Sequence, residues 1–162
     1  MVEDQATIDR RYLLRAIELS VEQVRSGRGG PFGAVIVRDG AVVAEGCNEV
    51  TASLDPTAHA EVVAIRRACQ GLGDFSLAGA MIYASCEPCP MCLAAIYWAR
   101  LDRLVFANTR AEAASIGFDD ALIYDEIPKP ISARRLPTLH LPLREGVDAF
   151  AEWARKPDKL AY

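Results

Sequence analysis

Two short clusters of metal-binding side chains stand out in this chain of 162 residues, the segment His59-Ala-Glu61 and the segment Cys86-Glu-Pro-Cys89-Pro-Met-Cys92. Imidazole nitrogens and cysteine thiolates are ligands that Zn²⁺ prefers in proteins. Three protein ligands would leave one tetrahedral position for water, which distinguishes a catalytic zinc site from a structural one. We therefore expect His59, Cys89 and Cys92 to bind one zinc ion, which would lower the pKa of a bound water toward about 7.

Glu61 stands two residues after the predicted histidine ligand. A carboxylate this close to a catalytic metal is suited to carrying protons between water and a substrate. We therefore expect Glu61 to act as the proton shuttle without binding the metal.

The predicted ligands fall at the beginnings of two helices. Pro88 predicts the start of a helix that runs to about Ala99, because proline suits a first helical position, where its missing N–H would have no partner. Residues three apart lie on one helix face, so both thiols can reach one ion, and the helix dipole favours their thiolate forms. A second helix, from about residue 58 to 70 with Thr57 as its cap, carries the histidine in its first turn.

Cys86 leaves alternatives open. It could pair with Cys89, or it could complete a Cys₃His site that is structural and has no open position. A buried thiol at the end of a strand is the interpretation we favour. Cys47 and Cys69 are expected in the core, and His140 is expected to be structural.

The remaining pattern predicts strands that alternate with helices. Residues 34–37 and 41–44 flank Asp39-Gly40 and predict a hairpin, and residues 81–84 and 104–107 predict two further strands. An amphipathic helix is expected over residues 8–26, a further strand at Leu139–Leu141, and a last helix over residues 146–156. Strand, helix and strand in succession indicate an α/β fold whose sheet is partly parallel.

Length and composition predict one soluble globular domain over residues 1–162. The chain is 51% hydrophobic and 25% charged, with a net charge of −4. This acidic balance argues against a nucleic-acid partner, because phosphate binding depends on clustered basic side chains. The acidic start lacks the pattern of a signal peptide and no run is long enough to span a membrane, so we expect a cytoplasmic protein with no membrane partner.

The two clusters together match the signature of zinc deaminases, a histidine-x-glutamate followed by proline-cysteine-x-x-cysteine. Further segments are similar to the bacterial guanine deaminases of the cytidine deaminase-like fold. They run from residue 29 to the C-terminus and include Gly30-Pro-Phe-Gly-Ala34, Glu45-Gly-Cys-Asn48 and Gly117-Phe-Asp-Asp120.

This resemblance implies a three-layer α/β/α fold with a five-stranded mixed sheet, one zinc ion per subunit and a purine substrate, most simply guanine. It also implies a homodimer that exchanges C-terminal segments, here about residues 130–162. The residues that it assigns to substrate binding are Phe32, which would stack on the purine, Asn48, Ala60, Asp120 and the C-terminal Tyr162. Local alternatives remain open: Phe32 in the core, Asn48 in a turn, and Asp119 in place of Asp120.

Three other functions remain as alternatives. A tRNA adenosine deaminase would share the zinc signature, but the C-terminal segment here mixes acidic residues with Arg155 and Lys156. A deaminase of cytosine or an aminotriazine would also share it. A structural-zinc interaction module would have no use for Glu61.

Overall fold

Four strands form one mixed sheet in the order β2-β1-β3-β4 in the computed structural model, which describes residues 3–161. The strands are β1 (Gly33–Arg38), β2 (Ala41–Cys47), β3 (Ala80–Cys86) and β4 (Arg103–Asn108). β1 pairs antiparallel with β2 and β3, and β3 pairs parallel with β4. The mixed sheet and its partly parallel character are confirmed.

The expectation of five strands is wrong, since residues 3–161 contain four. The predicted strand at Leu139–Leu141 lies in an irregular segment, where both leucine side chains are exposed. Pro137 and Pro142 bracket this segment. Proline has no N–H to donate to a neighbouring strand, so the segment is poorly suited to pairing.

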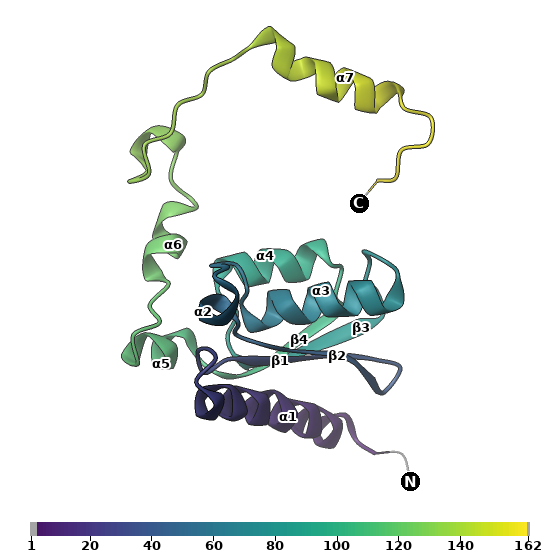
Figure 1. The fold of residues 1–162 in the computed structure, drawn as a ribbon, viewed down its shortest axis with the longest axis vertical. Coiled ribbons are helices and arrows are strands. Elements are labelled where there is room, and N and C mark those ends of the chain that lie inside the picture. Colours follow the sequence, from purple (N-terminus) through teal and green to yellow (C-terminus); the bar gives the residue numbers. More distant parts are fainter. Residues whose placement is uncertain (1–2, 162) are drawn as a thin grey trace. The chain divides into compact units, whose positions relative to one another are not determined.

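Helices cover both faces of the sheet, which confirms the three-layer arrangement (Figure 1). Helix α1 (Gln5–Ser26) packs on one face, and α3 (Ala60–Leu72) and α4 (Pro90–Trp98) lie on the other. The alternation of side chains along β1 supplies both halves of the core. Val35 and Val37 pack beneath α1, whereas Ala34 and Ile36 pack with α3 and α4.

The predicted hairpin is present between β1 and β2. Asp39 and Gly40 have φ angles of 52° and 75°, the left-handed values that a tight type I′ turn needs at both central positions. The hydroxyl of Tyr12 donates a hydrogen bond of 2.5 Å to the Gly40 carbonyl, so α1 is tied to this turn.

Two predicted helix starts are displaced by a few residues. His59, not Thr57, is the N-cap of α3, and the Thr57 hydroxyl instead donates to Asp55. Cys89 is the N-cap of α4, so Pro90 and not Pro88 occupies the first helical position. The proline that follows holds Cys89 in an extended conformation and delays the helix.

The described residues divide into two compact units, residues 3–120 and residues 121–161. The second unit contains α6 (Ala121–Glu126), the short 3₁₀ helices η1 (Ile131–Ala133) and η2 (Arg144–Val147), and α7 (Asp148–Arg155). The helix expected over residues 146–156 is therefore present as α7. Among residues 3–161, no helix combines the length and the apolar character needed to cross a membrane.

The strand register places the start of β1 and the ends of β2, β3 and β4 at the same end of the sheet. Gly33 at the start of β1 pairs with Cys47 at the end of β2. Ala84, near the end of β3, pairs with the start of β1, and the last residue of β3 pairs with the last residue of β4. The segments before β1 and after β2, β3 and β4 carry the predicted site residues, so the topology brings them to the same end of the sheet.

Gly46 lets α3 approach this end of the sheet closely. A Cβ atom at Gly46 would lie 2.2 Å from the Ala60 carbonyl oxygen and 2.6 Å from the Ala64 nitrogen. Only glycine fits here, because both neighbours are backbone atoms that cannot move aside. The beginning of α3, with His59, is thereby held against the end of β2.

Candidate active site

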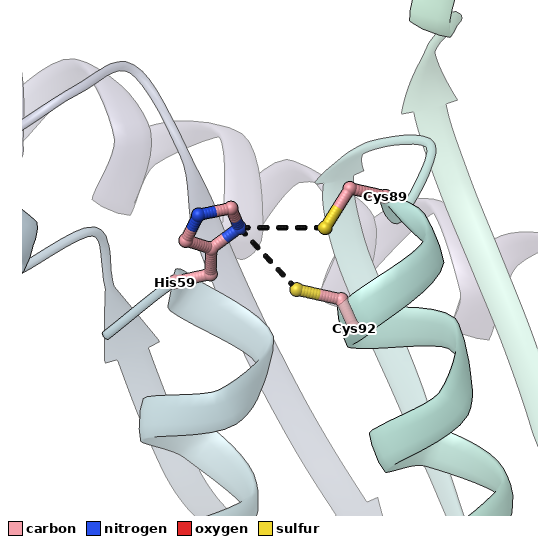
Figure 2. A group of neighbouring side chains, drawn as sticks. All are labelled: His59, Cys89 and Cys92. Carbon is pink, nitrogen blue, oxygen red and sulfur yellow. Dashed lines mark hydrogen bonds between the residues drawn. The ribbon is translucent and has the colours of Figure 1, made fainter. Parts of the chain in front are cut away.

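His59, Cys89 and Cys92 point their ligand atoms toward one another (Figure 2). The Nδ1 atom of His59 lies 3.5 Å from each of the two sulfur atoms, and all three ligand atoms fall within 4.8 Å of one another. A tetrahedral zinc with Zn–N near 2.0 Å and Zn–S near 2.3 Å places its ligand atoms about 3.5–3.8 Å apart. The three side chains therefore have the spacing and the chemistry to bind one zinc ion.

Helix starts supply two of these ligands. His59 is the N-cap of α3 and Cys89 is the N-cap of α4, and Cys92 follows within the first turn of α4. The N-terminus of a helix carries a partial positive charge and unpaired N–H groups, both of which stabilise a thiolate. The start of α4 thus favours the thiolate of Cys89, its N-cap residue.

The two cysteine ligands shift each other's pKa in opposite directions. A hydrogen bond from Cys92 lowers the pKa of Cys89 to about 4, and the same bond, together with burial, raises the pKa of Cys92. The pKa of His59 is raised, chiefly by its contact with Cys89. Zinc binding must displace the proton of Cys92, so metal affinity depends on pH.

Cys86 does not belong to the metal-binding group formed by the described residues. It ends β3, is buried, and directs its sulfur toward the Thr109 carbonyl oxygen at 3.7 Å. The interpretation as a buried strand-end thiol is confirmed, and neither alternative involving a disulfide or a fourth ligand is seen, since all five cysteines are free.

Glu61 lies in the first turn of α3 and is 7% exposed. Burial raises the pKa of its carboxyl group, and the neighbouring Cys89 raises it further. A raised pKa brings a carboxyl group closer to neutrality, where it can both accept and return a proton. The location beside the metal ligands and this environment suit the role expected from the sequence.

Phe32 and Asn48 are neighbours at the same end of the sheet, where the Asn48 N–H donates to the Phe32 carbonyl at 3.1 Å. The Asn48 side-chain oxygen accepts from the backbone N–H groups of Gly30 and Val50, each at 3.4 Å. The donors of this side chain are in its NH₂ group, which is the part that could bind the acceptor of a ligand. Phe32 is partly buried and also packs against the hydrophobic core, as the alternative of a core role expects.

Asp120 is partly buried, whereas Asp119 is exposed. Burial raises the pKa of Asp120, Arg110 opposes that rise, and the charge of Cys89 adds to it. Tyr162 falls outside the described residues.

Sequence reasoning missed three residues that contact the predicted ones. Gln23 of α1 is buried and donates a hydrogen bond of 2.6 Å to the Asn48 carbonyl. The ring of Phe118 packs edge-on against Phe32. Arg110 forms an ion pair with Asp120. No local motif marks these residues, because each contact joins distant parts of the sequence or depends on the shape of a loop.

Comparisons with known proteins agree with this geometry. The chain is 52% identical to guanine deaminase of Bacillus subtilis over 151 residues, which cover 93% of this chain and 97% of that protein. The crystal structure of that B. subtilis enzyme matches with a TM-score of 0.93 at 50% identity, covering 99% of both chains. A tRNA-specific adenosine deaminase of Aquifex aeolicus is 30% identical over 78% of this chain and 81% of its own.

The family profile described as the cytidine and deoxycytidylate deaminase zinc-binding region matches residues 6–108. This span contains every predicted metal ligand and Glu61. The chain belongs to the cytidine and deoxycytidylate deaminase family of zinc-binding proteins.

Proposed function

We propose that this protein is a zinc-dependent guanine deaminase, which hydrolyses guanine to xanthine and ammonia. The observation that carries the choice of guanine is the 52% identity with the B. subtilis guanine deaminase, which spans 97% of that enzyme. The tRNA deaminase of A. aeolicus is similar at only 30% identity. The reaction class itself follows from the three converging ligands and the buried carboxylate beside them.

In the proposed reaction, zinc held by His59, Cys89 and Cys92 supplies the means to activate a water molecule as nucleophile at neutral pH. Glu61 accepts one proton from that water and delivers it to the ring nitrogen beside C2. Glu61 then takes the remaining proton from the hydroxyl group added at C2 and transfers it to the amine nitrogen. The C2 carbonyl forms as the bond between C2 and that nitrogen breaks, and ammonia leaves. Glu61 acts first as a general base and then as a general acid, and it ends in its starting state.

The proposed substrate contacts involve both the hydrogen-bond donors and the hydrogen-bond acceptors of the guanine ring. Guanine has N–H groups that can donate hydrogen bonds to the Asp120 carboxylate. It also has acceptor atoms that can receive hydrogen bonds from the Asn48 NH₂ group. Phe32 offers an aromatic face for stacking. Ala60 is fully buried at the first position of α3, where a backbone N–H has no partner within its helix, so it can contribute a main-chain donor. A buried polar site of this kind rejects rings that leave its groups unpaired.

The second unit supports a further proposal, a homodimer that exchanges its C-terminal segment, about residues 130–162. None of residues 121–161 is buried, and α7 exposes large apolar side chains, among them Phe150 at 76%. Exposed apolar surface of this extent is typical of a protein interface. We infer that a second copy of the chain covers it and that Tyr162 closes the active site of the partner.

Mixing two inactive variants tests the exchange. In a dimer of Glu61→Ala with Tyr162→Ala, the site that keeps Glu61 would receive the intact tyrosine of the other chain. Co-refolded equal mixtures should then recover about a quarter of wild-type activity per subunit, because half of the dimers are mixed and each has one intact site. Activity no higher than the mean of the two separate variants would contradict the exchange.

Ammonia release tests the substrate. Zinc-loaded protein should release ammonia from guanine, and not from cytosine, adenine, an aminotriazine or an RNA stem-loop that carries adenosine in its anticodon. Activity on the stem-loop alone would replace guanine by tRNA. No ammonia from any of them, together with four sulfur or nitrogen ligands in the X-ray absorption spectrum, would indicate a structural zinc.

A further inference from the structure

Helix α5 (Arg110–Ser115) is short but fixed at both ends. Thr109 and Glu112 form a capping box at its start, with the Glu112 carboxylate accepting from the Thr109 N–H at 2.7 Å. At its end Gly117 has a φ of 97°, and the N–H groups of Gly117 and Phe118 donate back to carbonyls of the last turn. This is the Schellman arrangement. The segment that follows the helix therefore leaves in a defined direction.

The start of α5 is bonded to the loop that carries Cys89. The Glu87 carboxylate accepts from the Arg110 N–H at 3.0 Å, and the Glu87 N–H donates to the Asn108 carbonyl at 2.8 Å. Glu87 stands two residues before the metal ligand. The position of Arg110 is thus set by the same loop that positions the metal site.

The end of the α5 segment is packed against the proposed stacking ring. The rings of Phe118 and Phe32 are perpendicular, with centroids 4.9 Å apart. A Cβ atom at Gly30 would lie 3.3 Å from the Phe118 ring, so glycine leaves room for this contact. Asp120 follows Phe118 by two residues. The segment that leads to it is therefore held at the start of α5 by Glu87 and near its end by the contact between Phe118 and Phe32.

Arg110 and Asp120 face each other across this segment. The Arg110 Nε atom lies 3.7 Å from the Asp120 Oδ1 atom, and the two side chains are 38% and 19% exposed. Burial raises the pKa of the Asp120 carboxyl group, and the Arg110 guanidinium opposes that rise.

We propose that Arg110 is a positioning residue for the deamination reaction, which holds Asp120 ionised and aimed at the N–H donors of the ring. This inference rests on the proposed function, because it assumes a substrate with such donors. An ionised carboxylate accepts two strong hydrogen bonds, whereas a protonated one has lost part of that capacity. Arg110 would act through Asp120, without touching the ring.

Steady-state kinetics on the full-length, zinc-loaded protein test this role with two variants of Arg110 and one control variant. Arg110→Met should raise KM for guanine about three- to fivefold with kcat nearly unchanged, the size expected for one partly exposed ion pair. It should also move the acidic limb of the kcat/KM profile to higher pH, because the cation that opposes the effect of burial on Asp120 is then gone. Arg110→Lys should restore most of the loss. Arg10→Met, an exposed arginine on α1, is the matched control.

The decisive comparison is a double-mutant cycle. In an Asp120→Asn background, Arg110→Met should change kcat/KM by less than a factor of two, because the charge that it serves is gone. An equal loss in both backgrounds, or a loss no larger than that of Arg10→Met, would overturn the proposal and leave Arg110 as a structural residue.

A substrate-free measurement separates failure of this inference from failure of the proposed function. Carboxyl carbon NMR of the zinc-loaded protein identifies the Asp120 signal as the one that Asp120→Asn removes. Its titration midpoint should rise in Arg110→Met and stay in place in Arg10→Met. An unchanged midpoint would refute the role of Arg110 whatever the substrate is, whereas a raised midpoint without guanine turnover would refute the choice of guanine alone.

Discussion

Replacing Glu61 with glutamine should slow turnover by several orders of magnitude while zinc remains bound. Glutamine keeps the size of a side chain that is 7% exposed, so packing is preserved. It cannot carry a proton, and general acid–base catalysis contributes about 10²–10⁴ in rate. Since Glu61 serves two transfers in one cycle, we expect kcat to fall by about 10³–10⁴, which corresponds to roughly 4–5.5 kcal/mol of activation free energy.

The electrostatics of the site predict that zinc binds the variant at least as tightly. The pKa of Cys92 is raised first by its bond with Cys89, then by burial, and then by the charge of Glu61. Removing that last charge makes the Cys92 thiolate easier to form, and metal binding requires the thiolate. Zinc content per subunit, measured by plasma mass spectrometry, is therefore expected to equal that of the wild type.

Two outcomes would refute this reasoning. Loss of zinc from Glu61→Gln would mean that Glu61 is a ligand, and a rate within tenfold of the wild type would assign the proton transfers to another group. Glu18→Gln, an exposed glutamate on α1, is the control and should leave both zinc and rate unchanged.

Three further variants test the supports of the site. In Asp9→Asn we expect up to about 1 kcal/mol less stability to urea at neutral pH, because the Arg103 guanidinium lowers the pKa of Asp9 to about 2 and solvent screens this partly exposed pair. The deficit should shrink as pH falls from about 4 through 2, because the wild-type carboxylate then becomes protonated as well. Gln23→Met leaves a buried carbonyl without its donor, which should cost about 1–3 kcal/mol in urea unfolding and raise KM for guanine while zinc stays bound. If KM is unchanged, Gln23 supports only the fold. Gly46→Ala should weaken zinc binding measured by chelator competition, since a Cβ there meets the backbone of α3, whereas Gly71→Ala, with no atom within 4 Å, should not.

Most of the fold was predictable because its signals are local. The turn at Asp39-Gly40 carries the residues that left-handed φ angles favour, and the strands on either side alternate or run apolar. Helix boundaries were less predictable. Two prolines flank Cys89, and the sequence does not reveal which of them lies in the helix; the extended conformation that Pro90 imposes on Cys89 decides it.

The metal ligands could be found from the sequence because each group lies within one helical turn. The contacts around the proposed substrate-binding residues join parts of the chain that are distant in the sequence. Arg110 and Asp120 are ten residues apart around a capped helix, and Gln23 and Asn48 belong to separate elements. Such pairs form only after the sheet has gathered its strand ends at one end. Sequence spacing therefore identifies the reaction centre and leaves its surroundings open.

The difference between Cys86 and the two cysteine ligands also explains how the site can remain open for catalysis. Cys86 is the last residue of β3 and pairs with Asn108 of β4, so its backbone is held in the sheet. Its sulfur is turned toward the Thr109 carbonyl. To become a fourth ligand it would have to abandon the strand pairing and that contact together. The strand end thus keeps the third thiol of the motif away from the metal group, and a fourth coordination position stays available to water, which hydrolysis requires.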